Sequence, residues 1–159
     1  MRKALLAFFL LFSFNSYGAG AKIDIPKYDW SWKGFFGTYD RASAQRGLKV
    51  YREVCAGCHS MNYLAYRNLG DLGFSEDHIK AIAAEHLILD GPDDEGEMFE
   101  RDGIPSDQFA NPYPNVKAAR AANNGAYPPD LSLIVKARPK GADYVKALLL
   151  GYVDPPEDM

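Results

Sequence analysis

The sequence predicts a small, mainly α-helical domain with long irregular loops. Short segments whose apolar residues recur at helical spacing alternate with stretches rich in proline and glycine. The sequence has no convincing alternating strand and no internal repeat. The part of the chain after residue 21 is long enough for one domain with one hydrophobic core.

The first 21 residues have the organisation of a secretory signal peptide. A basic start, Met1 to Lys3, precedes an apolar run over residues 4–12 and a small, polar stretch over residues 13–21. The apolar run is too short to span a bilayer, which needs ~20 residues. We therefore expect cleavage after Ala19 or Ala21 and an exported, periplasmic domain over residues 22–159.

The formal net charge of −3 includes two basic residues of the signal, so the exported domain is more acidic than this figure. An acidic domain argues against nucleic acid as a partner. The later apolar run over residues 147–153 is short and is interrupted by Gly151. The printed chain is thus expected to lack a membrane anchor of its own.

The N-terminal half is expected to contain an arm and three helices. Residues 22–39 are rich in aromatic residues and carry Pro26, which favours an extended arm. Asp40 is a candidate N-cap for a helix that runs to Cys55. The residues on its apolar face are Ala44, Gly47, Leu48, Tyr51, Val54 and Cys55, and Gly47 is expected to permit a close helix crossing.

Two shorter helices are expected next. Residues 62–69 form the first, which ends at Gly70, and Ser75 caps the second. The apolar face of the second helix carries Ile79, Ile82, Ala83 and His86.

The acidic run from Asp90 to Asp102 has two open interpretations. It is either a solvated loop or a docking patch that attracts a basic partner. Residues 103–114 are rich in proline and glycine and predict a long wrapping loop.

Three further helices are expected in the C-terminal part. Asn115 caps a helix that runs through Ala122, and residues 128–130 open another helix. The second of these is expected to turn Leu131, Ile134 and Val135 inward. The last helix covers residues 142–150 and ends at Gly151.

The only two cysteines form a Cys-x-x-Cys-His motif at Cys55, Cys58 and His59. This spacing is the attachment signature of c-type haem, in which both thiols add to the haem vinyl groups and the imidazole binds the iron. The sequence therefore predicts one covalent haem c, with His59 as a metal ligand.

Three other interpretations of the motif stay open at this point. A redox-active dithiol is expected just after a strand, a zinc site needs two more ligands, and a disulfide across two residues closes a very small loop. The second axial position of a haem iron has weak candidates in His78, His86 and Met98, whereas Met61 is too close to His59 to reach the opposite face of the haem.

Several longer stretches resemble the N-terminal part of the cytochrome c1 family, in an alphaproteobacterial-like form. They are residues 46–54 leading into the haem motif, 90–97, 118–124, 128–132, 137–138 and 143–144. The resemblance implies a cytochrome c-like helical haem domain, with thioether bonds to Cys55 and Cys58 and iron bound by His59. It also implies that Arg138 pairs with a haem propionate and that Asn123, Pro129, Leu131 and Tyr144 line the haem pocket.

The resemblance further implies two features that follow later in the family. One is a methionine that supplies the second axial ligand, and the other is a C-terminal transmembrane helix. The printed chain ends at Met159, so we expect a haem domain that is C-terminally incomplete and lacks its sixth ligand.

The function implied is one-electron transfer from the Rieske iron-sulfur protein to a soluble cytochrome c. The full-length protein would act beside cytochrome b in ubiquinol:cytochrome c reductase, at the periplasmic face of the bacterial inner membrane. It would be a component of that complex rather than an enzyme by itself. A soluble periplasmic monohaem carrier is the alternative in the same chemistry, and an exported thiol-disulfide oxidoreductase is the alternative from another class.

Overall fold

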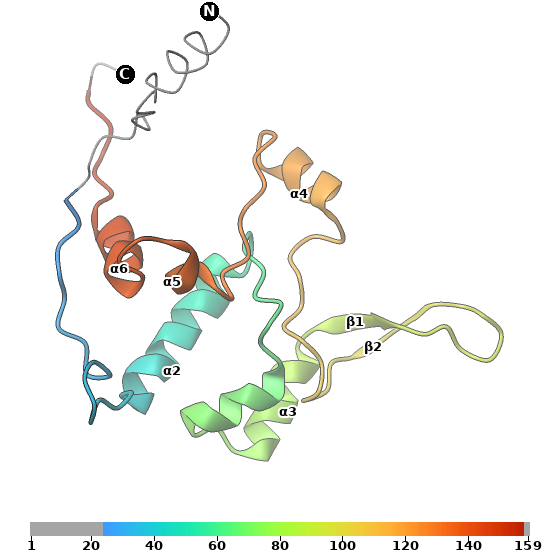
Figure 1. The fold of residues 1–159 in the computed structure, drawn as a ribbon. Coiled ribbons are helices and arrows are strands. Elements are labelled where there is room, and N and C mark those ends of the chain that lie inside the picture. Colours follow the sequence, from blue (N-terminus) through green and yellow to red (C-terminus); the bar gives the residue numbers. More distant parts are fainter. Residues whose placement is uncertain (1–23, 158–159) are drawn as a thin grey trace, which may run out of the picture.

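Residues 24–157 are described by the structure, a computed structural model, and they are mainly helical with one two-stranded sheet (Figure 1). The predicted signal peptide, residues 1–21, and Met159 lie outside the described residues. Within residues 24–157 no helix combines the length and the apolar composition that crossing a bilayer requires. The helical class predicted from the sequence is confirmed.

The N-terminal arm, residues 24–40, runs beside helix α6 (Ala142–Leu150), as Figure 1 shows. The arm is attached to α6 through the buried carboxylate of Asp143. This carboxylate accepts hydrogen bonds from Trp30 Nε1 at 2.6 Å and from the Tyr28 amide at 3.2 Å. The Trp30 hydrogen bond, with help from Tyr28 and Lys33, lowers the pKa of Asp143 although burial opposes this. The predicted extended arm is confirmed.

Helix α2 (Arg41–Val50) leads to the haem motif. Asp40 caps it, because its side chain accepts a hydrogen bond from the Ser43 amide at 3.1 Å. The helix continues as one π-helical turn, η1 (Tyr51–Cys55), which ends at the first cysteine. The predicted close crossing at Gly47 is wrong for the described residues, since a Cβ at this exposed position would meet no atom within 4 Å.

The next helices are η2 (Tyr66–Leu72), of 3₁₀ type, and α3 (Glu76–Ala84). The predicted helix over residues 62–69 is therefore shifted, and it ends at Gly73, whose positive φ of 91° terminates the helix in the left-handed region. Ser75 caps α3 as predicted and accepts from the His78 amide at 3.3 Å.

The hydrophobic core forms where α2, η1, η2 and α3 meet the loop that follows the sheet. Phe109 of this loop enters the core, and its amide donates to the Leu64 carbonyl at 3.0 Å. The wrapping loop predicted over residues 103–114 is thus confirmed. The buried members of the core are Leu48, Tyr51, Tyr66, Leu69, Ile79, Ile82, Ala83 and Phe109.

Strands β1 (Leu87–Asp90) and β2 (Phe99–Asp102) pair antiparallel and form a hairpin that projects from the helices (Figure 1). The expectation of no strands was wrong here, because four-residue strands carry too little alternation to be recognised. The Arg101 guanidinium anchors the hairpin base through ion pairs with Asp90 and Asp107. The hydrogen bonds that Arg101 donates lower the pKa of the Asp90 carboxyl and of the Asp107 carboxyl.

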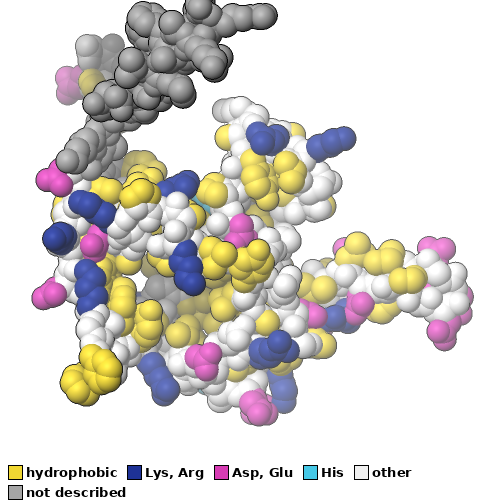
Figure 2. Space-filling view, in the orientation of Figure 1, with side chains coloured by type: hydrophobic (Ala, Val, Ile, Leu, Met, Phe, Trp, Pro, Cys, Tyr) yellow, Lys and Arg dark blue, Asp and Glu magenta, His cyan; other side chains and the backbone are white. Residues whose placement is uncertain are grey.

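The acidic side chains gather at the far end of this hairpin (Figure 2). Asp93 stabilises the turn at this end, since its Oδ1 accepts hydrogen bonds from the amides of Glu95 at 3.0 Å and Glu97 at 2.9 Å. The remaining tip carboxylates, those of Asp94, Glu95 and Glu97, are exposed. The acidic run therefore lies at the end of a projecting hairpin that Arg101 anchors, and not in a loop that lies on the surface.

The C-terminal part contains α4 (Val116–Ala122), α5 (Ile134–Ala137) and α6. The bounds of α4 and α6 match the prediction, and Asn115 caps α4 by accepting from the Ala118 amide at 3.0 Å. The helix expected from residue 128 was wrong, because α5 begins only at Ile134. Val135 is exposed, not inward as predicted.

Candidate haem-binding site

The haem motif lies in a tight turn at the end of η1. The amides of Cys58 and His59 both donate to the Cys55 carbonyl, at 3.1 and 2.9 Å. This turn brings two thiols and an imidazole together within five residues, and both thiols are free. Cys55 is half-buried and Cys58 is exposed, so both sulfurs have access to a ligand placed against this turn.

The His59 ring is oriented by a residue far away in sequence. Its Nδ1 lies 2.8 Å from the Pro129 carbonyl oxygen. Because a carbonyl oxygen only accepts, Nδ1 carries a proton, and in the neutral ring Nε2 then has the free lone pair. A neutral imidazole held in this tautomer is the form that binds a metal.

Asp130, the next residue after Pro129, joins residues 130–132 to residues 60–62, which follow His59. Its Oδ2 accepts from the Ser60 hydroxyl and from the Asn62 amide, each at 2.8 Å, and its Oδ1 accepts from the Ser132 amide at 2.8 Å. We call these three hydrogen bonds the Asp130 clasp.

Two backbone amides strengthen the same junction. The Leu131 amide donates to the Ser60 carbonyl at 2.9 Å, and the Tyr63 amide donates to Ser132 Oγ at 3.0 Å. Burial alone would raise the pKa of Asp130, but hydrogen bonds from the Ser132 side chain, the amides of Asn62 and Ser132, and the Ser60 hydroxyl lower it to about 2. Asp130 is thus ionised and fully engaged at neutral pH. These contacts also explain why residues 128–133 are not helical.

Tyr51 makes a second contact with the haem motif from the core. Its hydroxyl donates to the His59 carbonyl at 3.2 Å. The ring lies 6.0 Å from that of Phe109, which in turn stacks on Tyr66 at 4.8 Å. Burial, with a smaller contribution from the charge of Asp130, raises the pKa of Tyr51 to about 12. The His59 peptide is therefore fixed both by the core and by the proline segment.

Two clefts open beside the motif and share Asn62. The first, of about 130 Å³, is lined by Cys58, Tyr113 and Tyr127 among others. The second, of about 330 Å³, is lined by Pro129, Ile134 and Arg138 among others. Aromatic and aliphatic walls with a guanidinium at the rim suit a flat apolar ligand that carries carboxylates.

The structure brings most of the predicted pocket residues to this region. Arg138 and Pro129 line the larger cleft together. Leu131 packs against the core beside the motif. Asn123 stands behind the smaller cleft, where its Nδ2 donates to Tyr113 Oη at 3.1 Å. Tyr144 is not among them, because it lines a separate cleft of about 530 Å³ between the N-terminal arm and α6.

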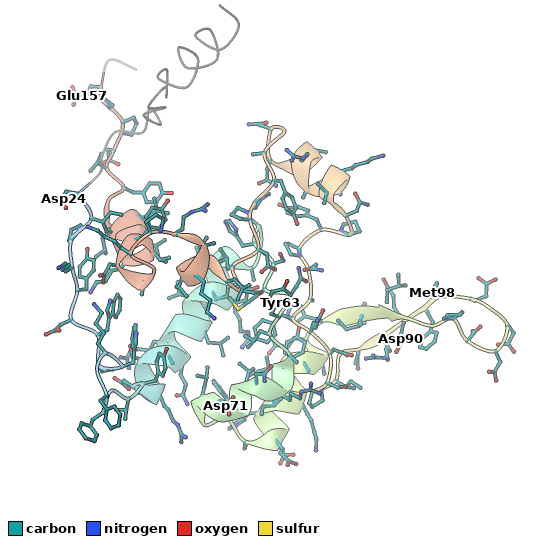
Figure 3. The ribbon with its side chains drawn as sticks, viewed as in Figure 1. Asp24, Tyr63, Asp71, Asp90, Met98 and Glu157 are labelled. Atoms are coloured by element: carbon teal, nitrogen blue, oxygen red, sulfur yellow. The ribbon has the colours of Figure 1, made fainter. Side chains whose placement is uncertain are left out.

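The weaker candidates for a second iron ligand are scattered. His78 is exposed on α3, and His86 stacks on Tyr66 with ring centroids 6.0 Å apart. Met61 packs against the hydrophobic core. Met98 lies on the projecting hairpin, away from Tyr63 and the region of the motif (Figure 3). Among residues 24–157, no three of the histidine, cysteine or acidic side chains are grouped as a metal site.

The surroundings of the motif differ from those of a redox-active dithiol. Such a pair is expected after a strand of a βαβ unit. In the described residues the motif lies at the end of α2 and η1, and both strands follow it in the sequence, in one hairpin. The residues present fit a c-type haem instead, since two free thiols and an imidazole whose Nδ1 is already engaged adjoin clefts that contain aromatic and aliphatic side chains.

Sequence reasoning missed the residues that hold the motif in place. Asp130 was expected to help open a helix, and Ser60 and Asn62 were not singled out. Tyr51 was assigned only to the apolar face of its helix. The available signal was the pair of polar residues Ser60 and Asn62 directly after the histidine, but their partner Asp130 lies about 70 residues away in the sequence.

Comparison with known proteins identifies the family of the chain. The sequence model of the Cytochrome C1 family matches residues 30–159. Cytochrome c1 of the alphaproteobacterium Rhodospirillum rubrum is 57% identical over 130 residues, which cover 82% of this chain and 48% of the relative. A mitochondrial cytochrome c1 heme protein of Solanum tuberosum is 55% identical over 134 residues, covering 84% of this chain and 52% of the relative.

A third relative is named cytochrome b-c1 complex catalytic subunit, mitochondrial, and comes from Candida albicans. It is 53% identical over 131 residues, which cover 82% of this chain and 46% of the relative. The chain therefore spans about half the length of these curated relatives. With a family match over most of its residues and identities above one half, the chain belongs to the cytochrome c1 family.

Proposed function

We propose that this chain holds one c-type haem through thioether bonds from Cys55 and Cys58, with His59 as an axial iron ligand, and that it transfers single electrons. The observation that carries this proposal is the hydrogen bond from His59 Nδ1 to the Pro129 carbonyl, which leaves Nε2 for the iron. The names of the Solanum tuberosum relative, a heme protein, and of the Rhodospirillum rubrum cytochrome c1 support it.

The haem iron supplies the redox chemistry when it is bound, by gaining and losing one electron. The protein residues bind and orient it. The Pro129 carbonyl places a proton on His59 Nδ1 and orients the ring, while Tyr51 and the Asp130 clasp fix the peptide on either side of it. Arg138, at the rim of the larger cleft, binds a haem propionate through its planar guanidinium.

The remaining wall residues have weaker support. Pro129 and Leu131 adjoin the motif directly, and Asn123 steadies the Tyr113 wall of the smaller cleft. Tyr144 keeps its proposed pocket role on the family resemblance alone, since its cleft lies between the arm and α6.

The proposed electron path leads from the Rieske iron-sulfur protein to a soluble cytochrome c. Within a complex that also contains cytochrome b, the domain would lie on the periplasmic face of the bacterial inner membrane, joined to the membrane by a C-terminal anchor of the full-length protein. The name of the Candida albicans relative, a subunit of the cytochrome b-c1 complex, supports this assignment. The exported position rests on the signal peptide predicted for residues 1–21.

The acidic hairpin is the proposed docking site for the soluble cytochrome c. Its tip exposes Asp94, Glu95 and Glu97 at the end of a projection whose base is fixed by Arg101. A group of charges of one sign at the end of a projection attracts a basic partner before contact and raises the rate of association.

The chemistry of attachment is tested by the pyridine haemochrome spectrum of the protein made with a cytochrome c maturation system. We expect the absorption of a haem that has lost both vinyl groups, and the absorption of a haem with one remaining vinyl in a Cys55→Ala variant. A thiol-disulfide oxidoreductase would instead be isolated without haem and with a dithiol that reacts reversibly with an oxidised peptide.

A further inference from the structure

The hydrogen bond between His59 and Pro129 depends on how two distant peptide segments are held together. Proline has no amide proton and no polar side chain, so Pro129 has no hydrogen-bond donor of its own that could hold its carbonyl against His59. The residues that immediately follow each partner are Ser60 and Asp130, and their side chains are 2.8 Å apart. The junction nearest to the histidine bond is therefore the Asp130 clasp.

We propose that Asp130 is a positioning residue for the iron ligand: its carboxylate locks residues 60–62 to residues 130–132 and so keeps the Pro129 carbonyl against His59 Nδ1. The inference rests on the proposed function, because it assigns Asp130 a part in haem ligation. It concerns a residue that touches neither the thiols nor the imidazole.

The geometry of the clasp explains why a carboxylate is needed. Its two oxygens accept from three donors on two segments, the Ser60 hydroxyl and the amides of Asn62 and Ser132. A carboxylate is an acceptor only, and hydrogen bonds to a charged acceptor are stronger than those between neutral groups. An amide side chain of the same shape would turn an N–H₂ group toward at least one of these donors. Ser60 is 8% exposed, so its hydroxyl has little access to replacement water.

Loosening the clasp should act on the bond between His59 and the iron. A hydrogen bond from Nδ1–H to a carbonyl increases the basicity of the imidazole and fixes the orientation of its ring. When the carbonyl moves away, Nε2 becomes a weaker donor to the metal. The expected signature is a shift of the iron–histidine stretching vibration of the ferrous protein to lower frequency.

A general effect of negative charge near the haem is the alternative explanation. Asp130→Asn removes both the charge and an acceptor, whereas Ser60→Ala removes one hydrogen bond of the clasp and retains the charge. Asp143→Asn is the matched control, since Asp143 is also a well-buried carboxylate that accepts from two donors, but these belong to the N-terminal arm.

The test uses the full 159-residue chain, made with a cytochrome c maturation system, and records resonance Raman spectra of the ferrous protein just after photolysis of its carbon monoxide complex. Photolysis leaves the iron bound to its histidine, so the stretching frequency reports on His59. We expect a lower frequency in Asp130→Asn, a smaller shift in the same direction in Ser60→Ala, and an unchanged frequency in Asp143→Asn.

The outcomes separate this inference from the proposed function. If the wild-type chain carries no covalent haem, the proposed function itself is wrong. If wild type carries haem and Ser60→Ala keeps the wild-type frequency, Asp130 has no positioning role, whether or not Asp130→Asn accumulates. An equal shift in Asp143→Asn would also overturn the inference, because it would show that the frequency follows charge and stability rather than the clasp.

Discussion

The Nδ1 atom of His59 lies 2.8 Å from the carbonyl oxygen of Pro129, although 70 residues separate the two in the sequence. This contact joins the haem motif at the end of η1 to the segment before α5. It fixes the tautomer of the imidazole and the direction in which Nε2 points. Under the proposed function, iron binding by His59 thus depends on the packing of two segments and not on the five-residue motif alone.

Tyr51→Phe should destabilise the haem-loaded protein by about 1 kcal/mol. The change removes the hydrogen bond from the hydroxyl to the His59 carbonyl and keeps the ring that stacks on Phe109. The measurement is the free energy of unfolding in guanidinium chloride. Tyr39→Phe is the control, because Tyr39 is 70% exposed in the N-terminal arm and should give no measurable change.

The same tyrosine predicts a loss of stability at alkaline pH. Its pKa is about 12 in the folded protein and 10.0 is the ordinary value, so the folded state favours the neutral phenol. The contribution is fully present below pH 10 and is lost as the pH rises from 10 to 12, by about 2 kcal/mol in all. Urea unfolding at a series of pH values measures this loss, which Tyr51→Phe should abolish. An identical decline in the variant would contradict the assignment to Tyr51.

Asp130 predicts the opposite dependence at acid pH. Its carboxyl has a pKa of about 2 in the folded protein and an ordinary value of 3.8, so the folded state favours the ionised form. The contribution is present above pH 4 and is lost as the pH falls toward 2. It amounts to about 1–2 kcal/mol after allowance for screening by solvent. Acid titration of stability should show a shallower decline between pH 4 and 2 in Asp130→Asn than in wild type.

Arg101→Met should loosen the hairpin without unfolding the helical core. The variant loses the ion pairs that join β2 to Asp90 of β1 and to Asp107 of the following loop. Amide hydrogen exchange should become faster in both strands and stay unchanged in α2. Lys80→Met serves as the control, since the ion pair of Lys80 with Asp77 is exposed on α3. Unchanged exchange in the strands would show that the hairpin is held by its other contacts.

Neutralising the hairpin tip should slow electron transfer to a basic cytochrome c. The variant Asp94→Asn, Glu95→Gln, Glu97→Gln leaves Asp93 in place, because Asp93 holds the turn. We expect an association rate about 2- to 10-fold lower at low salt and a weaker dependence on salt, since screening over ~10 Å at 0.1 M removes the same attraction. Stopped-flow measurement over a range of ionic strength gives both quantities.

The control for this measurement neutralises three carboxylates elsewhere, in the variant Asp71→Asn, Glu76→Gln, Asp77→Asn. These residues belong to η2 and the first turn of α3, away from the hairpin (Figure 3). The net charge changes equally in the two variants. Equal effects on the rate and on its salt dependence would mean that the total charge matters and the hairpin has no special part.

Local signals in the sequence were sufficient for several elements. The caps Asp40, Ser75 and Asn115 were all predicted, and each accepts a hydrogen bond from the amide three residues later. These signals are contained in a few consecutive residues. The cysteine and histidine residues of the haem motif were recognisable for the same reason, and so were the bounds of α4 and α6.

The errors arose where contacts between distant residues decide the structure. Residues 128–133 have the start signal of a helix, but Asp130 is occupied by Ser60 and Asn62 and the helix begins only at Ile134. The hairpin was missed because its two short strands are recognisable only as a pair. The support that Tyr51 and Asp130 give to His59 could not be predicted either, since it depends on the packing of the whole domain.

The most direct test of the account is whether haem remains attached to the denatured protein. The full chain, made with a cytochrome c maturation system, should run on a denaturing gel as a band that stains for haem. Its intact mass should exceed that of the processed polypeptide by one haem. The double variant Cys55→Ala, Cys58→Ala should be unstained, with the mass of the polypeptide alone. A stable, exported and unstained wild-type chain would contradict the central claim.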